Sequence, residues 1–320
     1  MLETIELPGS ARRTTRLGFG GSGLMGGLSE RESLRLLETA YDAGIHHFDV
    51  APSYGHGMAE RCLGKFLRGK IDQVTVATKY GILPPRRAGL LDLTRNLARP
   101  ILRRLPSVRA RVGQAAAGLK TKASFSAEEA ERSLEHSLRA LGVERIDLWL
   151  LHEATAEDLD RSDLLPHLQK MRERGRIGMY GLATERNNLG ALWKKHRDYC
   201  GVLQFEWSVL DPKSDFPGAF CIHHRTVSGA LSSIKQFFGD DPALCRRWSD
   251  ELDANLAQSE IVASLLLTAA LSSNPNRVVL FSSRSPAHIL ANVRAANDPT
   301  WVARSQRFLQ LLGQRAASSR

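Results

Sequence analysis

The chain has 320 residues, of which 42% are hydrophobic and 24% are charged, and its formal net charge at pH 7 is +10. This composition supplies enough apolar residues for a large core, which excludes a disordered chain and a small disulfide-stapled protein. The longest uncharged apolar stretch, residues 261–271, is too short to cross a bilayer, and the N-terminus lacks the basic and apolar pattern of a signal peptide. We therefore expect a cytoplasmic protein of enzyme size with no membrane partner.

Short β-type runs alternate with helical patterns along most of the chain. Residues 4–7 and 13–17, separated by a turn at Pro8-Gly9, predict a short hairpin ahead of the main sheet. Ser126 and Glu129 are spaced as a capping box and predict the start of a helix. In chain order we expect further strands at 46–50, 73–78, 145–151, 177–183, 202–206, 219–223 and 277–282. The expected helices cover 29–43, 58–67, 126–141, 164–174, 188–196, 286–296 and 299–312, with more helical sequence between 224 and 273.

The alternation amounts to roughly eight strand–helix units, which favours a closed (β/α)8 TIM barrel over an open α/β sheet. No low-complexity linker divides the chain, so residues 1–320 are expected to form a single barrel domain. A long basic insert at residues 82–124 interrupts the pattern after the third strand. Cysteines are scattered without a C-x-x-C spacing, which argues against a zinc site or a disulfide framework, and we expect no metal.

Polar residues at the ends of three successive strands form the candidate catalytic set. Asp49 and Tyr54 follow the second strand, Lys79 the third and His152 the fourth, and chemistry in a barrel lies at these C-terminal strand ends. A lysine charge lowers the pKa of a nearby tyrosine, and an aspartate would hold that lysine in place. His152 would orient a carbonyl group or pass a proton. Each residue alone is more often structural, but together they predict proton transfer to a carbonyl oxygen.

Four segments carry a family resemblance. They are Leu17-Gly-Phe-Gly-Gly-Ser-Gly23, Asp42-Ala-Gly-Ile-His-His-Phe-Asp-Val-Ala-Pro-Ser-Tyr-Gly55, Ile146-Asp-Leu-Trp-Leu-Leu-His152 and Gly175-Arg-Ile-Gly-Met-Tyr-Gly-Leu182. With them the chain resembles the aldo-keto reductase family from about Leu17 to Asn292, apart from the basic insert. The resemblance implies that Tyr54 is the general acid/base, that Lys79 and Asp49 tune it, and that His152 lines the substrate site. Outside the insert, Glu153 and Trp207 are candidates for the substrate pocket.

The resemblance also implies a nicotinamide cofactor, NADP(H) or NAD(H), extended across the barrel mouth. Gly21 in the first-strand loop and Gln204 are the expected contacts near the nicotinamide. The usual polar pair after the fifth strand is Ala183-Thr184 here, so Thr184 alone would serve the carboxamide. His223 takes the place of the aromatic ring that stacks on the nicotinamide, with His224 as the alternative.

Residues 282–292 resemble the loop that binds the adenosine phosphate, and a helix starting at Pro286 suits a phosphate. Read alone, this loop is an ordinary capped helix start with a solvated arginine. Arg284 supplies a positive charge that favours NADP(H) over NAD(H), although Ser282 replaces a frequent lysine of the family. The cofactor contacts implied here are Ser283, Arg284, His288 and Asn292.

The insert at residues 82–124 holds ten basic residues and one acidic residue, so most of the net charge is local and we expect no nucleic-acid partner. Its leucines recur at helical spacing between arginines, as in a basic amphipathic segment. Three interpretations stay open. The segment packs its apolar stripe on the barrel, or forms a lid whose arginines meet an anionic substrate or an acidic partner, or anchors at a membrane surface.

The leading function is NADP(H)-dependent reduction of a small aldehyde or ketone, with Tyr54 as the general acid/base. Sugar-like and anionic carbonyl compounds are both candidate substrates. A regulatory barrel that binds the cofactor and docks a protein partner is the alternative from another class. A third interpretation is an aldolase-like barrel that uses Lys79 as a Schiff base, but it leaves Tyr54 and the nucleotide loop unexplained.

Overall fold

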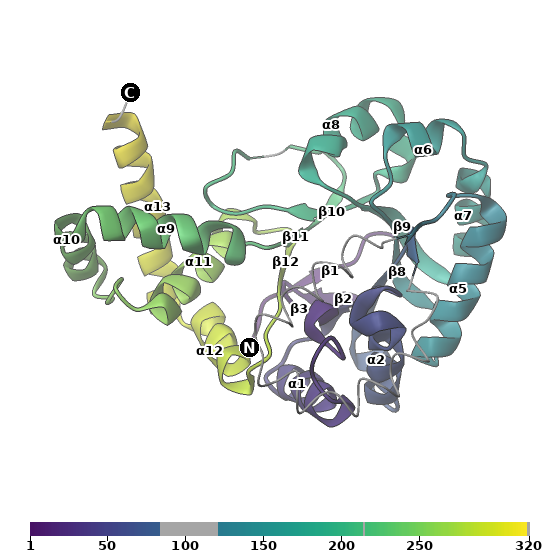
Figure 1. The fold of residues 1–320 in the computed structure, drawn as a ribbon, viewed down its shortest axis with the longest axis horizontal. Helices are drawn as coiled ribbons and strands as arrows, with labels where there is room; N and C mark the ends of the chain where they lie inside the picture. The colour runs from purple at the N-terminus through teal and green to yellow at the C-terminus, as the bar shows by residue number, and fades with distance from the viewer. Residues whose placement is uncertain (84–120, 214, 319–320) are drawn as a thin grey trace.

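The barrel predicted from the sequence is present in a computed structural model, which describes residues 1–83, 121–213 and 215–318. Eight parallel strands of the described chain close into a barrel in the order β3-β4-β5-β8-β9-β10-β11-β12 (Figure 1). Their bounds are β3 Leu17–Gly20, β4 His47–Asp49, β5 Thr75–Tyr80, β8 Ile146–His152, β9 Ile177–Ala183, β10 Val202–Glu206, β11 Phe220–His224 and β12 Val278–Phe281. All strands therefore end at one rim.

Six helices begin and end close to the predicted positions: α1 Glu30–Asp42, α2 Ala59–Leu67, α5 Ala127–Leu141, α7 Leu164–Glu173, α8 Arg186–Lys195 and α12 Pro286–Asn297. The C-terminal helix α13 Pro299–Ser318 begins where predicted but continues past the predicted end at residue 312. The short helix α6 Ala156–Asp160 was not predicted. Ser126 caps α5 as predicted, by accepting from the N–H of Glu129 at 3.3 Å. The predicted capping box is wrong, because the Glu129 carboxylate accepts from the N–H of Ser124 at 2.7 Å and not from Ser126.

A second hydrophobic core departs from regular strand–helix alternation. Residues 207–213 and 215–219, between β10 and β11, contain no helix, whereas α9 Ser228–Asp240, α10 Pro242–Leu252 and α11 Ser259–Ser273 all lie between β11 and β12. These three helices and α13 enclose apolar side chains that include Phe238, Trp248 and Phe308. In Figure 1 they gather at the left, apart from the barrel helices α2, α5 and α7. The single-domain assignment stays a prediction.

The barrel interior is a packed layer and not a channel. Every second residue of a strand faces it, as the period of two requires. Its apolar residues are Ala77, Leu148, Leu150, Ala183, Val202, Ile222, Val278 and Leu280, with Leu7 from the N-terminal segment. Because this layer fills the barrel, the space for chemistry lies above it at the rim.

The hairpin predicted at the N-terminus consists of β1 Thr4–Glu6 and β2 Arg13–Thr15, which pair antiparallel. It lies at the strands' N-terminal end of the barrel, where Arg12 Nη1 donates to Asp147 Oδ1 at 3.0 Å. In the described residues, no helix combines the length and the apolar character that a membrane crossing requires. The cytoplasmic location stays a prediction.

His47, which is fully buried at the start of β4, gives this end of the barrel a pH-dependent stability. Its Nδ1 lies 3.0 Å from Thr75 Oγ1, and burial lowers its pKa to about 4, with smaller opposing effects of Asp49 and Lys79. The unfolded chain, in which a histidine titrates near pH 6.5, therefore binds more protons than the folded chain between pH 6.5 and 4. This stabilisation is present above pH 6.5 and is lost as the pH falls toward 4.

We expect His47→Gln to reduce the loss of unfolding free energy between pH 7.5 and pH 4.5 by about 2 kcal/mol. Urea titrations of both proteins at the two pH values measure this difference, whatever the absolute stability of the variant. The exposed His136 gives a matched control, since His136→Gln should leave the pH dependence unchanged. An equal acid-induced loss in His47→Gln and the wild type would contradict the prediction.

Candidate active site

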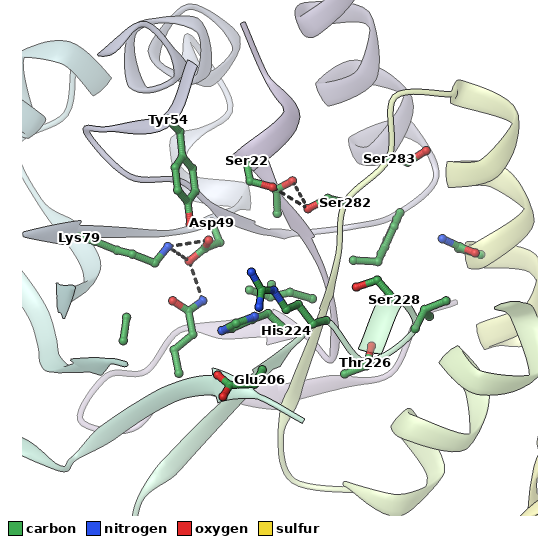
Figure 2. A pocket seen from close by; sticks show the side chains of 18 of the residues that line it. Ser22, Asp49, Tyr54, Lys79, Glu206, His224, Thr226, Ser228, Ser282 and Ser283 are labelled. Atoms are coloured by element: carbon green, nitrogen blue, oxygen red, sulfur yellow. Dashed lines mark hydrogen bonds and ion pairs between the residues drawn. The ribbon is translucent and has the colours of Figure 1, made fainter. Parts of the chain in front are cut away.

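A cavity of about 1060 Å³ opens at the C-terminal ends of the barrel strands. Its wall includes Asp49, Tyr54, Lys79 and His152 at one end, and residues of α12 as far as Asn292 at the other. In Figure 2, Tyr54 and Lys79 lie on the opposite side of this space from Ser228 and Ser283. This volume is in the range of sites that enclose a cofactor and a small substrate.

A buried ion pair forms the floor of the cavity at the end lined by Tyr54 and His152. Lys79 Nζ donates to both carboxylate oxygens of Asp49 at 2.7 Å and to the carbonyl oxygen of Val50 at 2.9 Å. Gln204 Nε2 donates to Asp49 Oδ2 at 2.9 Å, as the dashed lines in Figure 2 show. These hydrogen bonds satisfy the charges of both side chains, which are 3% and 5% exposed. The network fixes the ammonium group of Lys79 at the rim.

Tyr54 reaches this pair from the short 3-10 helix Tyr54–Gly57 that follows β4. Its hydroxyl points toward Lys79 and Asp49 (Figure 2), and Lys79 Nζ lies 5.1 Å from the centre of its ring. Gly55 has φ 55°, and a Cβ there would approach the carbonyl oxygen of Leu24 to 2.5 Å, so the turn after Tyr54 requires glycine. The ring of His152 stands edge to face with Tyr54 at a centroid distance of 6.2 Å. The four strand-end residues therefore meet.

The pKa of Tyr54 differs from the expectation drawn from its lysine neighbour. Burial raises the pKa of Tyr54, the Lys79 charge lowers it, and the Asp49 and Glu153 charges raise it, so that the net pKa lies above the usual value. The predicted direction of the Lys79 effect is right, but a lowered net pKa is wrong because burial outweighs the lysine. Tyr54 is consequently a neutral phenol at pH 7, which is the form that donates a proton.

Two other titratable groups at the rim are also shifted. Burial alone would lower the pKa of Lys79, but the charges of Asp49 and Tyr54 raise it overall, so the amine stays protonated. Burial and the Lys79 charge lower the pKa of His224 to about 4. His224 therefore presents a neutral imidazole to the cavity at neutral pH.

Five of the residues expected at the cofactor line this cavity: Thr184, Gln204, Ser283, His288 and Asn292. Thr184 is held on both sides, since its Oγ1 donates to the carbonyl oxygen of Ala154 at 3.2 Å and accepts from Asn188 Nδ2 at 3.2 Å. We did not predict this role of Asn188 from the sequence. Asn188 follows Thr184 by four residues and lies near the start of α8, and this spacing could have indicated a contact between the two side chains.

His223, which was expected beside the nicotinamide, does not line the cavity. The alternative residue, His224, does. The expected strand ended at residue 223, whereas β11 ends at His224, and side chains alternate between the two faces of a strand. Ile222 faces the barrel interior and His224 lines the cavity, so His223 points outward. It is fully buried there and accepts from Arg277 Nη1 at 3.0 Å.

Gly21, Arg284 and Trp207 are also outside the described lining of the cavity. Gly21 is buried between Val50 and Leu24, while its neighbours Gly20 and Ser22 line the cavity. Arg284 is exposed and lies beside Gly23. Trp207 donates through Nε1 to the carbonyl oxygen of Pro212 at 3.3 Å and packs on His223. Of the two substrate-pocket candidates, Glu153 alone reaches the wall.

The insert starts at the cavity. Its described ends, β6 Ile82–Leu83 and β7 Thr121–Lys122, pair antiparallel, and both residues of β6 line the cavity. Residues 84–120 lie outside the described residues. The three interpretations of the basic segment concern these residues and stay predictions.

A profile of the Aldo/keto reductase family matches residues 16–217, which is more than half of the chain. The chain belongs to the Aldo/keto reductase family. The resemblance read from the sequence motifs is thereby confirmed. The assignments of individual site residues stay predictions.

Two of the curated proteins that match part of the chain are dehydrogenases. D-threo-aldose 1-dehydrogenase from a Pseudomonas species is 33% identical over 178 residues, which cover 52% of this chain and 49% of that protein. Pyridoxal 4-dehydrogenase from Microbacterium luteolum is 30% identical over 223 residues, which cover 63% of this chain and 61% of that protein. The matches thus span about half to three fifths of the length of these relatives.

Solved aldo-keto reductases share the fold over nearly the whole chain. An aldo-keto reductase from Bacillus halodurans in its holo form has a TM-score of 0.70 at 18% identity, covering 96% of each chain. An aldo/keto reductase from Klebsiella pneumoniae in complex with NADP and acetate has a TM-score of 0.61 at 16% identity, covering 97% of this chain and 96% of that one. The predicted (β/α)8 TIM barrel is thereby confirmed.

Proposed function

We propose that this aldo-keto reductase uses NADP(H) to reduce an aldehyde or a ketone, with Tyr54 as the proton donor. One observation carries the proposal: Tyr54 meets the buried Lys79–Asp49 pair at one end of a cavity whose other end reaches α12. A phenol held beside a lysine charge suits protonation of a carbonyl oxygen, and the length of the cavity suits a dinucleotide beside the substrate.

The cavity residues fit a nicotinamide dinucleotide. Gln204 uses Nε2 to bind Asp49, which leaves its carbonyl oxygen to accept from a carboxamide. At the other end, α12 starts with Pro286 and its N-cap residue Ser285 makes no side-chain capping hydrogen bond among the described residues, so its first-turn N–H groups suit a phosphate. Arg284 adds an exposed positive charge beside this loop, which supports NADP(H) over NAD(H). When bound, NADPH supplies a hydride to the carbonyl carbon.

The residues of the chain supply the proton and its stabilisation. Tyr54 is protonated at neutral pH and donates its proton as negative charge develops on the carbonyl oxygen. The ammonium of Lys79 then stabilises the phenolate, while Asp49 holds that ammonium in position. His152, edge to face with Tyr54, gives the substrate oxygen a second polar neighbour that orients it.

The names of the two curated relatives support oxidoreduction of small molecules, since one acts on a D-threo-aldose and the other on pyridoxal. The Klebsiella pneumoniae structure supports the choice of cofactor, because that protein is in complex with NADP.

Calorimetric titration with NADPH and with NADH, followed by NADPH oxidation at 340 nm with a panel of aldehydes and ketones, tests the proposal. We expect NADPH to bind at least ~10-fold more tightly than NADH, as one charge-assisted contact to the 2′-phosphate would give, and at least one carbonyl compound to be reduced. Absence of binding by both cofactors would contradict the proposal. Binding of NADPH without turnover of any carbonyl would favour the regulatory barrel instead.

A further inference from the structure

Glu60 is a buried acidic residue outside the cavity. It lies in the first turn of α2, is 1% exposed, and is not among the described residues that line the cavity. Burial raises the pKa of Glu60, although the Thr78 hydroxyl and the Lys79 charge act in the opposite direction. Because a glutamate is rarely buried to this extent unless its carboxyl group has a partner, the contacts of Glu60 indicate why it is there.

The partner of the Glu60 carboxyl group is on strand β5. Thr78 Oγ1 donates to Glu60 Oε1 at 2.7 Å, and both residues are buried. Ala77 faces the barrel interior and Lys79 lines the cavity, so Thr78, which lies between them, faces the surrounding helices. The hydrogen bond therefore joins the first turn of α2 to β5 at the residue directly before Lys79.

A short turn joins Tyr54 to the start of α2. Gly55, His56 and Gly57 have φ values of 55°, 58° and 90°, so three successive residues of this turn have a left-handed backbone. Such a segment keeps its conformation when the structure around it fixes both of its ends. At the barrel end, the N–H of Tyr54 donates to the carbonyl oxygen of Ala51 at 3.0 Å. The other end of the turn is held by α2.

Close packing and the buried hydrogen bond both hold α2 in place. At Gly64 the helix approaches α5 so closely that a Cβ would lie 2.4 Å from the carbonyl oxygen of Ala140. At its first turn, the bond from Thr78 to Glu60 fixes the helix to β5. Since Lys79 follows Thr78, one bond links the segment that carries the tyrosine to the strand that carries the lysine.

We propose that Glu60 is a positioning residue for the reaction at Tyr54. By accepting the hydrogen bond of Thr78 on the outer face of β5, it holds the turn that carries Tyr54 at a fixed distance from Lys79. A displacement of about 1 Å at a reacting group can lower a rate by about 100-fold, so a residue outside the cavity can control the proton transfer. This inference rests on the proposed function of the cavity.

Substitutions at both ends of the bond test the inference, with NADPH and the compound that wild-type enzyme reduces best among the aldehydes and ketones. Glu60→Met removes the acceptor and Thr78→Val removes the donor. Each should lower kcat by ~10–100-fold and leave KM and the Kd of NADPH within ~3-fold of wild type. Glu60→Gln keeps a carbonyl oxygen that accepts from Thr78, so its kcat should stay within ~3-fold of wild type.

Thr14 gives a matched control at the opposite end of the same strand. Its buried Oγ1 lies 2.6 Å from Thr75 Oγ1, so Thr14→Val also removes a buried hydroxyl group that binds β5. This variant should keep the wild-type kcat. Urea titration shows whether each variant is folded, and Thr78→Val carries the test if Glu60→Met is not.

A cycle with Tyr54→Phe distinguishes positioning from a general loss of structure. In the Tyr54→Phe background no hydroxyl group remains to be misplaced, so adding Glu60→Met should change the residual single-turnover rate by less than ~2-fold. A residue that only stabilised the fold would give the same loss of rate in both backgrounds.

Three results overturn the inference while the proposed function stands. They are folded Glu60→Met and Thr78→Val variants that keep the wild-type kcat, a Glu60→Gln variant that loses as much as Glu60→Met, and an equal loss with and without the Tyr54 hydroxyl. If wild-type enzyme reduces none of the aldehydes and ketones, the proposed function fails and this inference fails with it.

Discussion

Tyr54→Phe is expected to lower kcat for carbonyl reduction by ~10²–10⁴-fold, while the affinity for NADPH changes little. The substitution removes one oxygen atom and keeps the ring that stands edge to face with His152. Lys79 loses its hydrogen bond with the tyrosine hydroxyl but keeps its bonds to Asp49 and to the carbonyl oxygen of Val50. Single-turnover oxidation of NADPH with a saturating aldehyde measures the chemical step, and calorimetry measures cofactor affinity.

The pH dependence of the wild-type enzyme provides a second readout of the same role. The pKa of Tyr54 is raised, so the phenol stays protonated through the neutral range and reduction should not lose rate between pH 6 and pH 9 for want of a proton donor. Tyr41 is a matched control, because its hydroxyl donates to Gln73 Oε1 at 2.5 Å outside the described lining of the cavity. Tyr41→Phe should retain wild-type turnover. Retention of more than a tenth of kcat in Tyr54→Phe would exclude the proton-donor role.

The sequence was sufficient to predict that residues far apart along the chain meet at one rim of the barrel. The strands β9 and β10 have the predicted bounds, since their apolar runs are buried on both faces and are flanked by polar residues. Once parallel strands are recognised, residues at their C-terminal ends must converge. Asp49 and His152 end their strands and Lys79 lies one residue from the end of β5. The hydrogen-bond distances between these residues, by contrast, depend on side-chain packing, which the spacing of residues along the sequence does not determine.

What the sequence could not predict follows from single-residue geometry and from long-range packing. Because side chains alternate between the two faces of a strand, an error of one residue in the strand boundary assigns the cavity position to His223 instead of His224. The left-handed backbone of Glu153 breaks that period and cannot be inferred from propensity, which assigns such conformations to glycine. The raised pKa of Tyr54 depends on how much water its neighbours exclude, which is a property of the folded chain.

Asp49→Asn should destabilise the protein by about 3–5 kcal/mol, because it removes the anionic partner of a lysine that is buried. The amide keeps the shape of the carboxylate but leaves the Lys79 ammonium, 3% exposed, with neutral acceptors such as the carbonyl oxygen of Val50. The shift of the urea midpoint at unchanged slope measures the loss. Glu157→Gln, which breaks an exposed ion pair between α6 and the following Arg161, should leave the midpoint unchanged.

The double variant Asp49→Asn/Lys79→Met separates the stabilising role of the pair from its catalytic role. Removing both charges leaves no buried ion without a partner, and such replacements are often neutral for stability. We therefore expect the double variant to recover most of the unfolding free energy that Asp49→Asn loses, but none of the activity, since no ammonium remains to stabilise the Tyr54 phenolate. Equal destabilisation by the single and double variants would contradict the explanation that Asp49→Asn destabilises by leaving a buried charge without its counter-ion. Recovery of stability without activity would show that the barrel tolerates the loss of this ion pair and that carbonyl reduction requires it.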